Sequence, residues 1–306
     1  MKAVLGLDGG GTKTLLRLTT LQKHVIVEET GQSSNICSCG RDKARENLCS
    51  LIRQALADAP EGTEVEAACI GSAGLLTGED AAFYEEILRR ETGCPCVLAR
   101  DDSVTALYAN LEDQPGLSLT AGTGSICLGK NSRDHFARAG GWGHLFSDEG
   151  SAYAIAVQAL RHSLWSVDGR GPATALLDLL LEAYGCTSAE ELTAAVYGGR
   201  EDKRQIASLS PLVDRAAEEG DAVAASILAD ASRDLLAMSQ AVIRRLDLWD
   251  SAFTVYLSGS VLLKSRLVRE AFAQGLITLH PQVRVLPGRR DAAWGAIYLA
   301  LRQLSA

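Results

Sequence analysis

The chain has 306 residues, enough for two modest domains rather than one compact core. Hydrophobic residues make up 47% and charged residues 22%, ordinary values for a globular protein, so the chain can bury a core and need not be disordered. The net charge is -8 and the basic residues are dispersed, so we expect no nucleic acid partner. The short apolar run at the N-terminus predicts neither a signal peptide nor a membrane partner, and we expect a cytoplasmic protein.

The first third of the chain alternates strands and helices. Three β-rich runs separated by DGGG and LQK predict an antiparallel meander over residues 3–8, 13–20 and 24–29. Apolar spacing and turn residues then predict a helix, a strand, a helix, a strand and a helix, over 41–58, 65–71, 79–91, 96–99 and 103–111. The order is βββαβαβα, as expected of an α/β domain.

The pattern begins again near Pro115 and Gly116. LSLTAG and SICLGK read as two strands around a GTGS turn, so the sequence indicates an internal duplication. Residues 148–246 are predicted to be almost wholly helical, followed by late strands at 253–259 and 283–286 and a closing helix, DAAWGAIYLALRQL. The second half is therefore the larger one.

Eight cysteines, including the pairs Cys37/Cys39 and Cys94/Cys96, lack the C-x2-C spacing of zinc sites. We interpret them as free thiols, with a metal or cluster role left open.

Two turns rich in glycine and threonine carry the first functional signal. DGGGTKT, residues 8–14, follows a strand, and glycine there permits positive φ and lets backbone N–H groups approach an anion such as phosphate. A plain hairpin turn is the alternative. A Walker loop and a Rossmann fingerprint are both excluded, because a strand follows the glycines instead of a helix.

The second turn, Gly122-Thr123-Gly124-Ser125, has the same construction. A third, LSGSV at 257–261, runs from a strand into Gly259 and Ser260 ahead of a helix expected near Leu263, and small residues there would leave room for adenine or ribose. Together the turns predict that the two halves of the chain bind ATP.

Several motifs resemble one known family. They are DGGGTKT, SSN at 33–35, RDDSVTAL at 100–107, AGTGS, GGWGHLFSDEGSAY at 140–153, LSGSVLLKS at 257–265 and the closing DAAWGA. In this order they resemble the BadF/BadG/BcrA/BcrD group of the sugar kinase, heat-shock protein and actin superfamily, and within it the N-acetylglucosamine kinases. The resemblance implies a two-domain, actin-like α/β ATPase fold built from duplicated ribonuclease H-like βββαβαβα units. The expected domains are 1–116 with the helix 290–306, and 117–289 with a helical insertion.

The resemblance also implies the reaction, transfer of a phosphoryl group from ATP to the 6-hydroxyl of an amino sugar. Asp102, at the start of a helix, is the expected general base, and its position beside a helix N-terminus suits proton transfer. Asp101 is the rival, and either residue could merely cap the helix. Asp8 corresponds to the aspartate that holds Mg2+, commonly through water.

The expected ATP-binding residues come from the three turns: Gly10, Gly11, Thr12, Lys13, Gly122, Thr123, Gly124, Gly259 and Ser260. The expected sugar-binding residues are Asn35, Asp102, Trp142, Gly143 and Asp148. Trp142 could instead belong to the core, Glu149 could fix the loop, and His144 more often supports such a loop than acts in catalysis.

Ile126 stands where animal-type relatives have a sugar-binding asparagine, so the substrate is expected to be an amino sugar. N-acetylglucosamine comes first, with glucosamine and N-acetylmuramic acid as alternatives. Two other functions remain: an ATPase activator of a radical acyl-CoA dehydratase or reductase, which needs cluster cysteines, and a sugar sensor without enzymatic activity. A homodimer is a further possibility.

Overall fold

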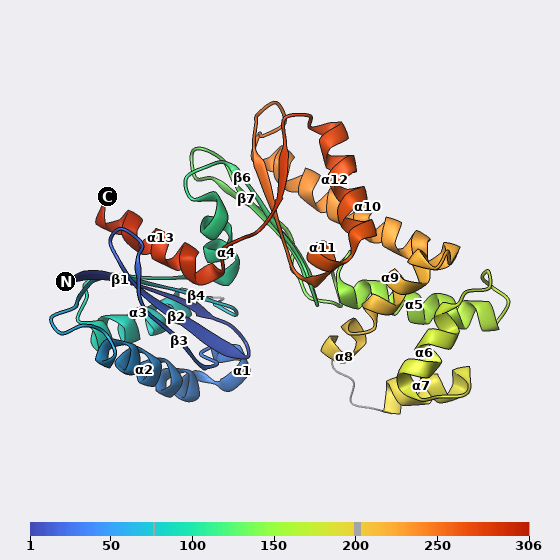
Figure 1. Cartoon of the computed structure of the whole chain (residues 1–306), viewed down its shortest axis with the longest axis horizontal. Coiled ribbons are helices and arrows are strands. Elements are labelled where there is room, and N and C mark those ends of the chain that lie inside the picture. The colour runs from blue at the N-terminus through green and yellow to red at the C-terminus, as the bar shows by residue number, and fades with distance from the viewer. Residues whose placement is uncertain (76, 199–202, 306) are drawn as a thin grey trace. The chain divides into compact units, whose positions relative to one another are not determined.

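The computed structural model describes residues 1–75, 77–198 and 203–305. The chain divides into two compact units, one formed by Met1–Gln114 with Gly288–Ala306 and the other by Pro115–Pro287 (Figure 1). The divisions predicted from the sequence lie after residue 116 and before residue 290. The backbone therefore passes between the units twice, once in each direction.

The first unit is built on a five-stranded sheet in the order β3-β2-β1-β4-β5. The first three strands pair antiparallel, which confirms the predicted meander, and the last two run parallel to β1. The strands are β1 (Lys2–Gly9), β2 (Lys13–Thr20), β3 (Val25–Gln32), β4 (Glu64–Ser72) and β5 (Cys96–Asp101).

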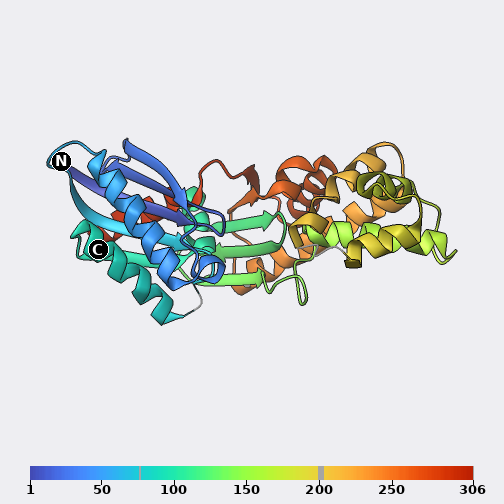
Figure 2. The same ribbon diagram turned by 90° about the horizontal axis from the view of Figure 1, so that it is seen from below.

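Helices cover both faces of this sheet (Figure 2). Those of the unit are α1 (Ile36–Cys39), α2 (Arg41–Ala57), α3 (Gly78–Thr92), α4 (Asp102–Leu111) and α13 (Ala292–Leu304); the short α1 was not predicted. Along β1, Leu5 and Leu7 pack with α2 and α3, whereas Val4 packs with α4 and α13, as strand alternation requires. Gly6 must be glycine, because a Cβ there would lie 2.7 Å from the Ala293 carbonyl oxygen. The closing helix thus packs directly on the central strand.

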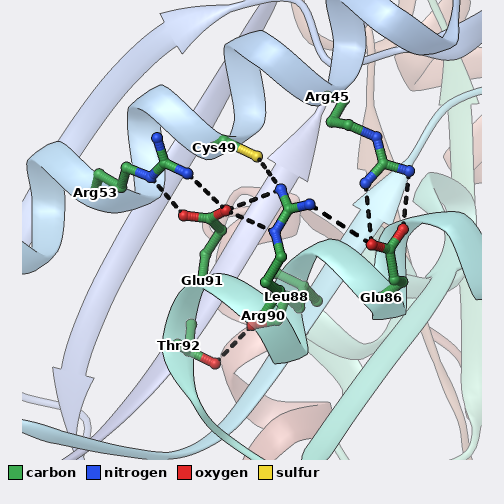
Figure 3. Close-up of polar contacts among 8 residues, drawn as sticks. All are labelled: Arg45, Cys49, Arg53, Glu86, Leu88, Arg90, Glu91 and Thr92. Atoms are coloured by element: carbon green, nitrogen blue, oxygen red, sulfur yellow. Dashed lines mark hydrogen bonds and ion pairs between the residues drawn. The ribbon is translucent and has the colours of Figure 1, made fainter.

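Ion pairs join α2 to α3 on the outer face (Figure 3). Glu91 of α3, with a side chain 5% exposed, accepts hydrogen bonds from Arg53 Nε of α2 at 2.6 Å and from Arg90 Nε at 3.0 Å. Arg90 Nη2 also donates to Cys49 Sγ at 3.0 Å. Burial, together with the bond to Glu91, raises the pKa of the Cys49 thiol. These contacts fix α2 to α3, so we assign them a structural role in the first unit.

The second unit repeats the sheet of the first. Its order is β10-β9-β6-β7-β8, in which β6, β7 and β8 pair antiparallel and β9 and β10 run parallel to β6. Counted from the first strand of each unit, both orders are 3-2-1-4-5, so the predicted duplication is present in the topology. The strands are β6 (Gly116–Ala121), β7 (Ser125–Lys130), β8 (Phe136–Gly140), β9 (Thr254–Ser258) and β10 (Arg284–Pro287); β8 was not predicted.

A large helical segment separates β8 from β9, as predicted for 148–246, except that residues 199–202 lie outside the described part of the chain. The long helix α10 packs against the sheet, while α6 and α7 lie beyond α5, away from it (Figure 1). No described helix has the length and apolar composition that crossing a membrane requires. The helices are α5 (Ala152–Val167), α6 (Leu176–Tyr184), α7 (Ala189–Gly198), α8 (Lys203–Ala207), α9 (Ser210–Glu218), α10 (Ala222–Arg245), α11 (Ser260–Lys264) and α12 (Arg266–Leu279).

Candidate active site

Two aspartates expected to be functional lie at one edge of the first sheet. Asp8 of β1 is paired with Gly71 of β4, and Gly71 is paired in turn with Arg100 of β5. Asp102 follows Arg100 by two residues and is the first residue of α4. Because the carboxyl ends of parallel strands meet at the same edge, Asp8 and Asp102 share that edge.

Asp101 and Asp102 have different roles in the structure. Asp101 is the N-cap of α4, and its Oδ1 accepts hydrogen bonds from the Ser103 backbone N–H at 3.0 Å and from the Ser103 hydroxyl. Capping is thus the work of Asp101, which leaves Asp102 available for another function. Burial, followed by the charges of Asp101 and Asp8, raises the pKa of Asp102 to about 6.

Asp8 lies near a further carboxylate, which the sequence analysis missed. Burial and the charge of Asp291 raise the pKa of Asp8, against a lowering by Lys13. Asp291 is the N-cap of α13, and it accepts hydrogen bonds from Arg17 Nη1 at 2.7 Å and Nη2 at 3.0 Å. The signals in the sequence were an aspartate before the closing helix and an arginine inside the apolar strand LLRLTT.

The residues around Asp8 fit a Mg2+ ion. The charges of neighbouring carboxylates help to raise the pKa of Asp8 and of Asp102, and a divalent cation would remove that penalty. Mg2+ is commonly held by one or two carboxylates, with water and substrate phosphates completing its shell.

In the first turn, hydrogen bonds hold the backbone at Gly10, and the next three residues are exposed to solvent. The Gly10 N–H donates to the Lys13 carbonyl at 3.1 Å, and the Ser33 hydroxyl donates to the Gly10 carbonyl at 3.0 Å. Gly11, Thr12 and Lys13 are exposed. The glycines of this turn do not use positive φ; Gly9 is required for space instead, since a Cβ there would lie 2.8 Å from Ser34 Oγ.

Asn35 follows β3 and caps the short helix α1. Its Oδ1 accepts a hydrogen bond from the Cys37 backbone N–H at 2.8 Å. The residue is nearly buried, at 6% exposure. If Asn35 binds a sugar hydroxyl, as predicted, the Nδ2 amino group is the part of the side chain that would donate.

The second and third turns meet in the other unit. Gly259 has φ +85°, and a Cβ there would lie 2.3 Å from the Ala121 carbonyl oxygen. Both the backbone conformation and the lack of space therefore require glycine. A Cβ at Gly122 would lie 3.8 Å from the Ser260 backbone nitrogen, which is ordinary contact. The helix after this turn begins at Ser260, earlier than the predicted start near Leu263, because Gly259 turns the chain at once.

A cavity of about 440 Å³ opens beside these turns. Its wall runs from Thr123 and Ser260 to Asp214 of α9 and includes Lys264 of α11. Asp214 accepts a hydrogen bond from the Ser265 hydroxyl at 2.5 Å, and burial raises the pKa of Asp214. Neither residue was predicted as a site residue: Asp214 lies on α9, which carries no recognisable motif, and Lys264 lies in the LSGSVLLKS motif but was assigned no role. The cavity offers room for a group attached to a phosphate held by the turns.

Asp148, an expected sugar ligand, holds the second turn in this structure. It is 3% exposed and has φ +69°, and its Oδ1 accepts a hydrogen bond from the Ser125 backbone N–H at 3.1 Å. Its Oδ2 pairs with Lys203 Nζ at 2.5 Å. Lys203 has no signal in the sequence, since 55 residues separate it from its partner. Sugar binding by Asp148 stays a prediction beside this observed role.

The rest of the GGWGHLFSDEG segment is an open loop. Trp142 is 68% exposed, which rules out the core alternative, and the Arg138 guanidinium lies 4.2 Å from its ring centroid. Gly143 adopts φ +85°. The His144 ring meets the Tyr153 ring edge-on at 5.1 Å, consistent with support of the loop. Glu149 accepts a hydrogen bond from the Ser147 hydroxyl at 3.0 Å.

The structure gathers the expected residues within each unit. Asp8, the first turn, Asn35 and Asp102 belong to the first unit; the second and third turns, Trp142, Gly143 and Asp148 belong to the second.

The model of the BadF/BadG/BcrA/BcrD ATPase family matches residues 5–299. The chain belongs to this family. It is 34% identical over 301 residues, 98% of each chain, to an N-acetylmuramic acid/N-acetylglucosamine kinase of Clostridium acetobutylicum. It is 29% identical over 97% of each chain to an N-acetyl-D-glucosamine kinase of Dictyostelium discoideum. A crystal structure from Chromobacterium violaceum, of a protein proposed to be an N-acetylglucosamine kinase, matches with a TM-score of 0.73 and 26% identity over 98% of this chain and 99% of that one.

All eight cysteines are free thiols in the structure. Cys69 and Cys127 are fully buried, and burial raises the pKa of each thiol to about 12, so neither forms a reactive thiolate. Cys37, in contrast, is exposed. The buried thiols suit a structural role. The relatives are named as kinases, which does not favour the cluster-bearing activator.

Proposed function

We propose that this protein transfers the γ-phosphoryl group of ATP to the 6-hydroxyl of N-acetylglucosamine, giving the sugar 6-phosphate and ADP. The observation that carries the proposal is Asp102, a carboxylate at a helix N-terminus with a pKa near 6, on the same sheet edge as Asp8. The names of the relatives support this choice of reaction.

The raised pKa suits Asp102 to general base catalysis. Near neutral pH the side chain is mostly ionised, yet it binds a proton more tightly than an ordinary aspartate does. As the bond between the sugar O6 and the γ-phosphorus forms, the hydroxyl proton passes to the Asp102 carboxylate, and the bond from the γ-phosphorus to ADP breaks. Catalysis of such transfers depends mainly on positioning and on charge stabilisation.

The three turns supply the nucleotide site of the proposal. Thr12 and Thr123 would hydrogen-bond phosphate oxygens together with backbone amides of the neighbouring glycines, and Lys13 would add positive charge. The cavity that begins at Thr123 and Ser260 would hold the adenosine. Mg2+, held by Asp8 through water, would neutralise charge on the transferred group.

The sugar would be bound by Asn35, Trp142, Gly143 and Asp148 together with Asp102. An exposed tryptophan presents an apolar face, and amide and carboxylate groups make directional bonds with vicinal hydroxyls. N-acetylmuramic acid is a second candidate substrate, favoured by the relative with 34% identity, whose name includes both sugars. A cytoplasmic location and a homodimer stay predictions.

A coupled assay of ADP release tests the proposal. Purified protein, ATP and Mg2+ are combined in turn with N-acetylglucosamine, N-acetylmuramic acid, glucosamine, N-acetylmannosamine and glucose. We expect the highest kcat/KM with one of the two N-acetyl sugars named by the relatives. Absence of turnover with every sugar, in a brown protein with iron–sulfur absorbance, would overturn the proposal in favour of the activator.

A further inference from the structure

Asn110, near the end of the helix that begins with Asp102, binds the segment on which the chain returns to the first unit. Its Oδ1 accepts hydrogen bonds from the backbone N–H groups of Arg289 at 2.9 Å and Arg290 at 3.2 Å. Its Nδ2 donates to the Arg290 carbonyl at 3.2 Å. One side chain thus satisfies three backbone groups of a segment about 180 residues distant in sequence, immediately after the return at Gly288.

The outgoing connection is joined to the same place. Glu112 caps the C-terminus of α4 with φ +49°, a conformation that non-glycine residues rarely adopt. Its Oε1 accepts hydrogen bonds from Arg290 Nη1 at 2.7 Å and from Lys23 Nζ at 2.9 Å. The chain leaves the unit after Gln114, so both connections are held at the C-terminal end of α4.

The other end of α4 is held by close backbone packing. A Cβ at Gly295 of α13 would lie 1.7 Å from the Thr105 carbonyl oxygen, and one at Gly71 would lie 2.1 Å from Thr105 Oγ1. Thr105 Oγ1 also donates to the Asp102 carbonyl at 2.9 Å. A helix packed this closely at one end and hydrogen-bonded at the other keeps its first residue, Asp102, in a fixed position.

We infer that Asn110 is a positioning residue for the general base: it binds the returning segment to α4 and so holds the helix that begins with Asp102 in its working position. The inference rests on the proposed kinase function. It assigns Asn110 no contact with a substrate. Its effect is on the placement of the Asp102 carboxylate, at the first residue of the same helix.

Asn131 provides a matched control. Its Oδ1 accepts hydrogen bonds from the backbone N–H groups of Arg133 at 3.0 Å and His135 at 3.1 Å, and its Nδ2 donates to the Leu246 carbonyl at 3.3 Å. Asn131 therefore makes the same kinds of hydrogen bonds as Asn110 and is similarly half-buried, but it lies in a hairpin of the second unit, at neither connection.

The test compares Asn110→Ala with Asn131→Ala in the full-length protein, by steady-state kinetics, pH profiles and thermal unfolding. We expect Asn110→Ala to lower kcat by roughly ten- to a hundredfold with little change in either KM, since a small misplacement of a catalytic group has effects of that order. In Asn110→Ala, the fall in activity at acid pH should move to lower pH. A less firmly held Asp102 would be better solvated, and solvation lowers the pKa of a carboxylate. Asn131→Ala should lower the melting temperature to a similar extent and leave kcat unchanged.

Asn110→Asp keeps both acceptor bonds and should restore most of the lost kcat. Equal kcat in Asn110→Ala and Asn131→Ala, or an unchanged pH profile in Asn110→Ala, would overturn the inference. Failure of the proposed function is distinguishable, because the unmodified protein would then turn over no sugar at all.

Discussion

Asp8 stands one residue before the end of the first strand in one unit, and Thr120 holds the equivalent position in the other. The pairs Gly9–Thr14 and Ala121–Ser125 close the two hairpins, so the strands before the turns can be compared residue by residue. After β5 the chain continues with Asp102 and α4, whereas after β10 it leaves the unit. Identical topology thus carries the candidate base and metal ligand in the first unit alone.

The turns themselves also differ. In the second unit the Gly122 N–H donates to the Gly124 carbonyl at 2.9 Å, the Ala152 N–H donates to the Gly122 carbonyl at 2.8 Å, and Gly259 packs on the backbone. In the first unit three successive residues of the turn are exposed. The duplicated sheet thus supplies a common frame, and the two units differ in the residues at their strand ends and connections.

The largest expected effect is in the first unit. Asp102→Asn removes the proton acceptor, so we expect kcat to fall by roughly 10²–10⁴-fold, the usual contribution of a general base, while sugar binding survives. The folded pKa of about 6 lies above the ordinary aspartate value of 3.8, so the fold loses stability as the pH rises from 3.8 to 6, and the full penalty for the charged side chain applies at pH 7. The variant should therefore melt at a higher temperature than the unmodified protein at pH 7.

Asp101→Asn is the control for this variant, because asparagine also caps helices well. It should keep turnover of the same order as the unmodified protein. Normal turnover in Asp102→Asn would refute the assignment of the base and leave Asp101 as the next candidate.

A smaller effect is expected from the rigid turn of the second unit. Gly259→Ala places a Cβ 2.3 Å from the Ala121 carbonyl oxygen, so the second and third turns must separate. We expect the Kd of an ATP analogue, measured by calorimetry, to rise by roughly tenfold or more, equivalent to about 1.4 kcal/mol.

Gly220→Ala is the matched control in the same unit. Gly220 has φ +96° but no atom within 4 Å of an added Cβ, so this change tests backbone strain alone, at roughly 1–2 kcal/mol of stability. If both variants bound the analogue equally well, the close packing of the two turns would have no part in nucleotide binding.

The sequence predicted the framework well, because hydrophobic periodicity and turn residues are local signals. The meander, the four longer helices of the first unit and the repeated hairpin follow from them. The strand β8, FARAG, was missed because it is short and its apolar residues are mostly alanine, and α1 was missed because four residues form one turn.

The site was predicted in part. The turns and Asp102 are marked by motifs, but the partners that adjust them come from distant segments. The charge of Asp291, the N-cap of the last helix, acts on Asp8, and Lys203 forms an ion pair with Asp148 although 55 residues separate them. Only the tertiary structure brings such pairs together, and only the burial of Asp102 reveals its raised pKa.

We propose that Asp102 is the general base, and that burial and its neighbours in the first unit raise its pKa. The most direct test is the pH dependence of kcat/KM for the sugar, at saturating ATP and Mg2+, in the unmodified protein and in Asp101→Asn. The base must be ionised to accept a proton, so activity should fall below pH about 6 in the unmodified protein. In Asp101→Asn this fall in activity should move to lower pH, because the charge that helps to raise the pKa of Asp102 is gone. Titration of ATP would instead affect both proteins alike. A fall at the same pH in both, or full activity well below pH 5, would contradict the account.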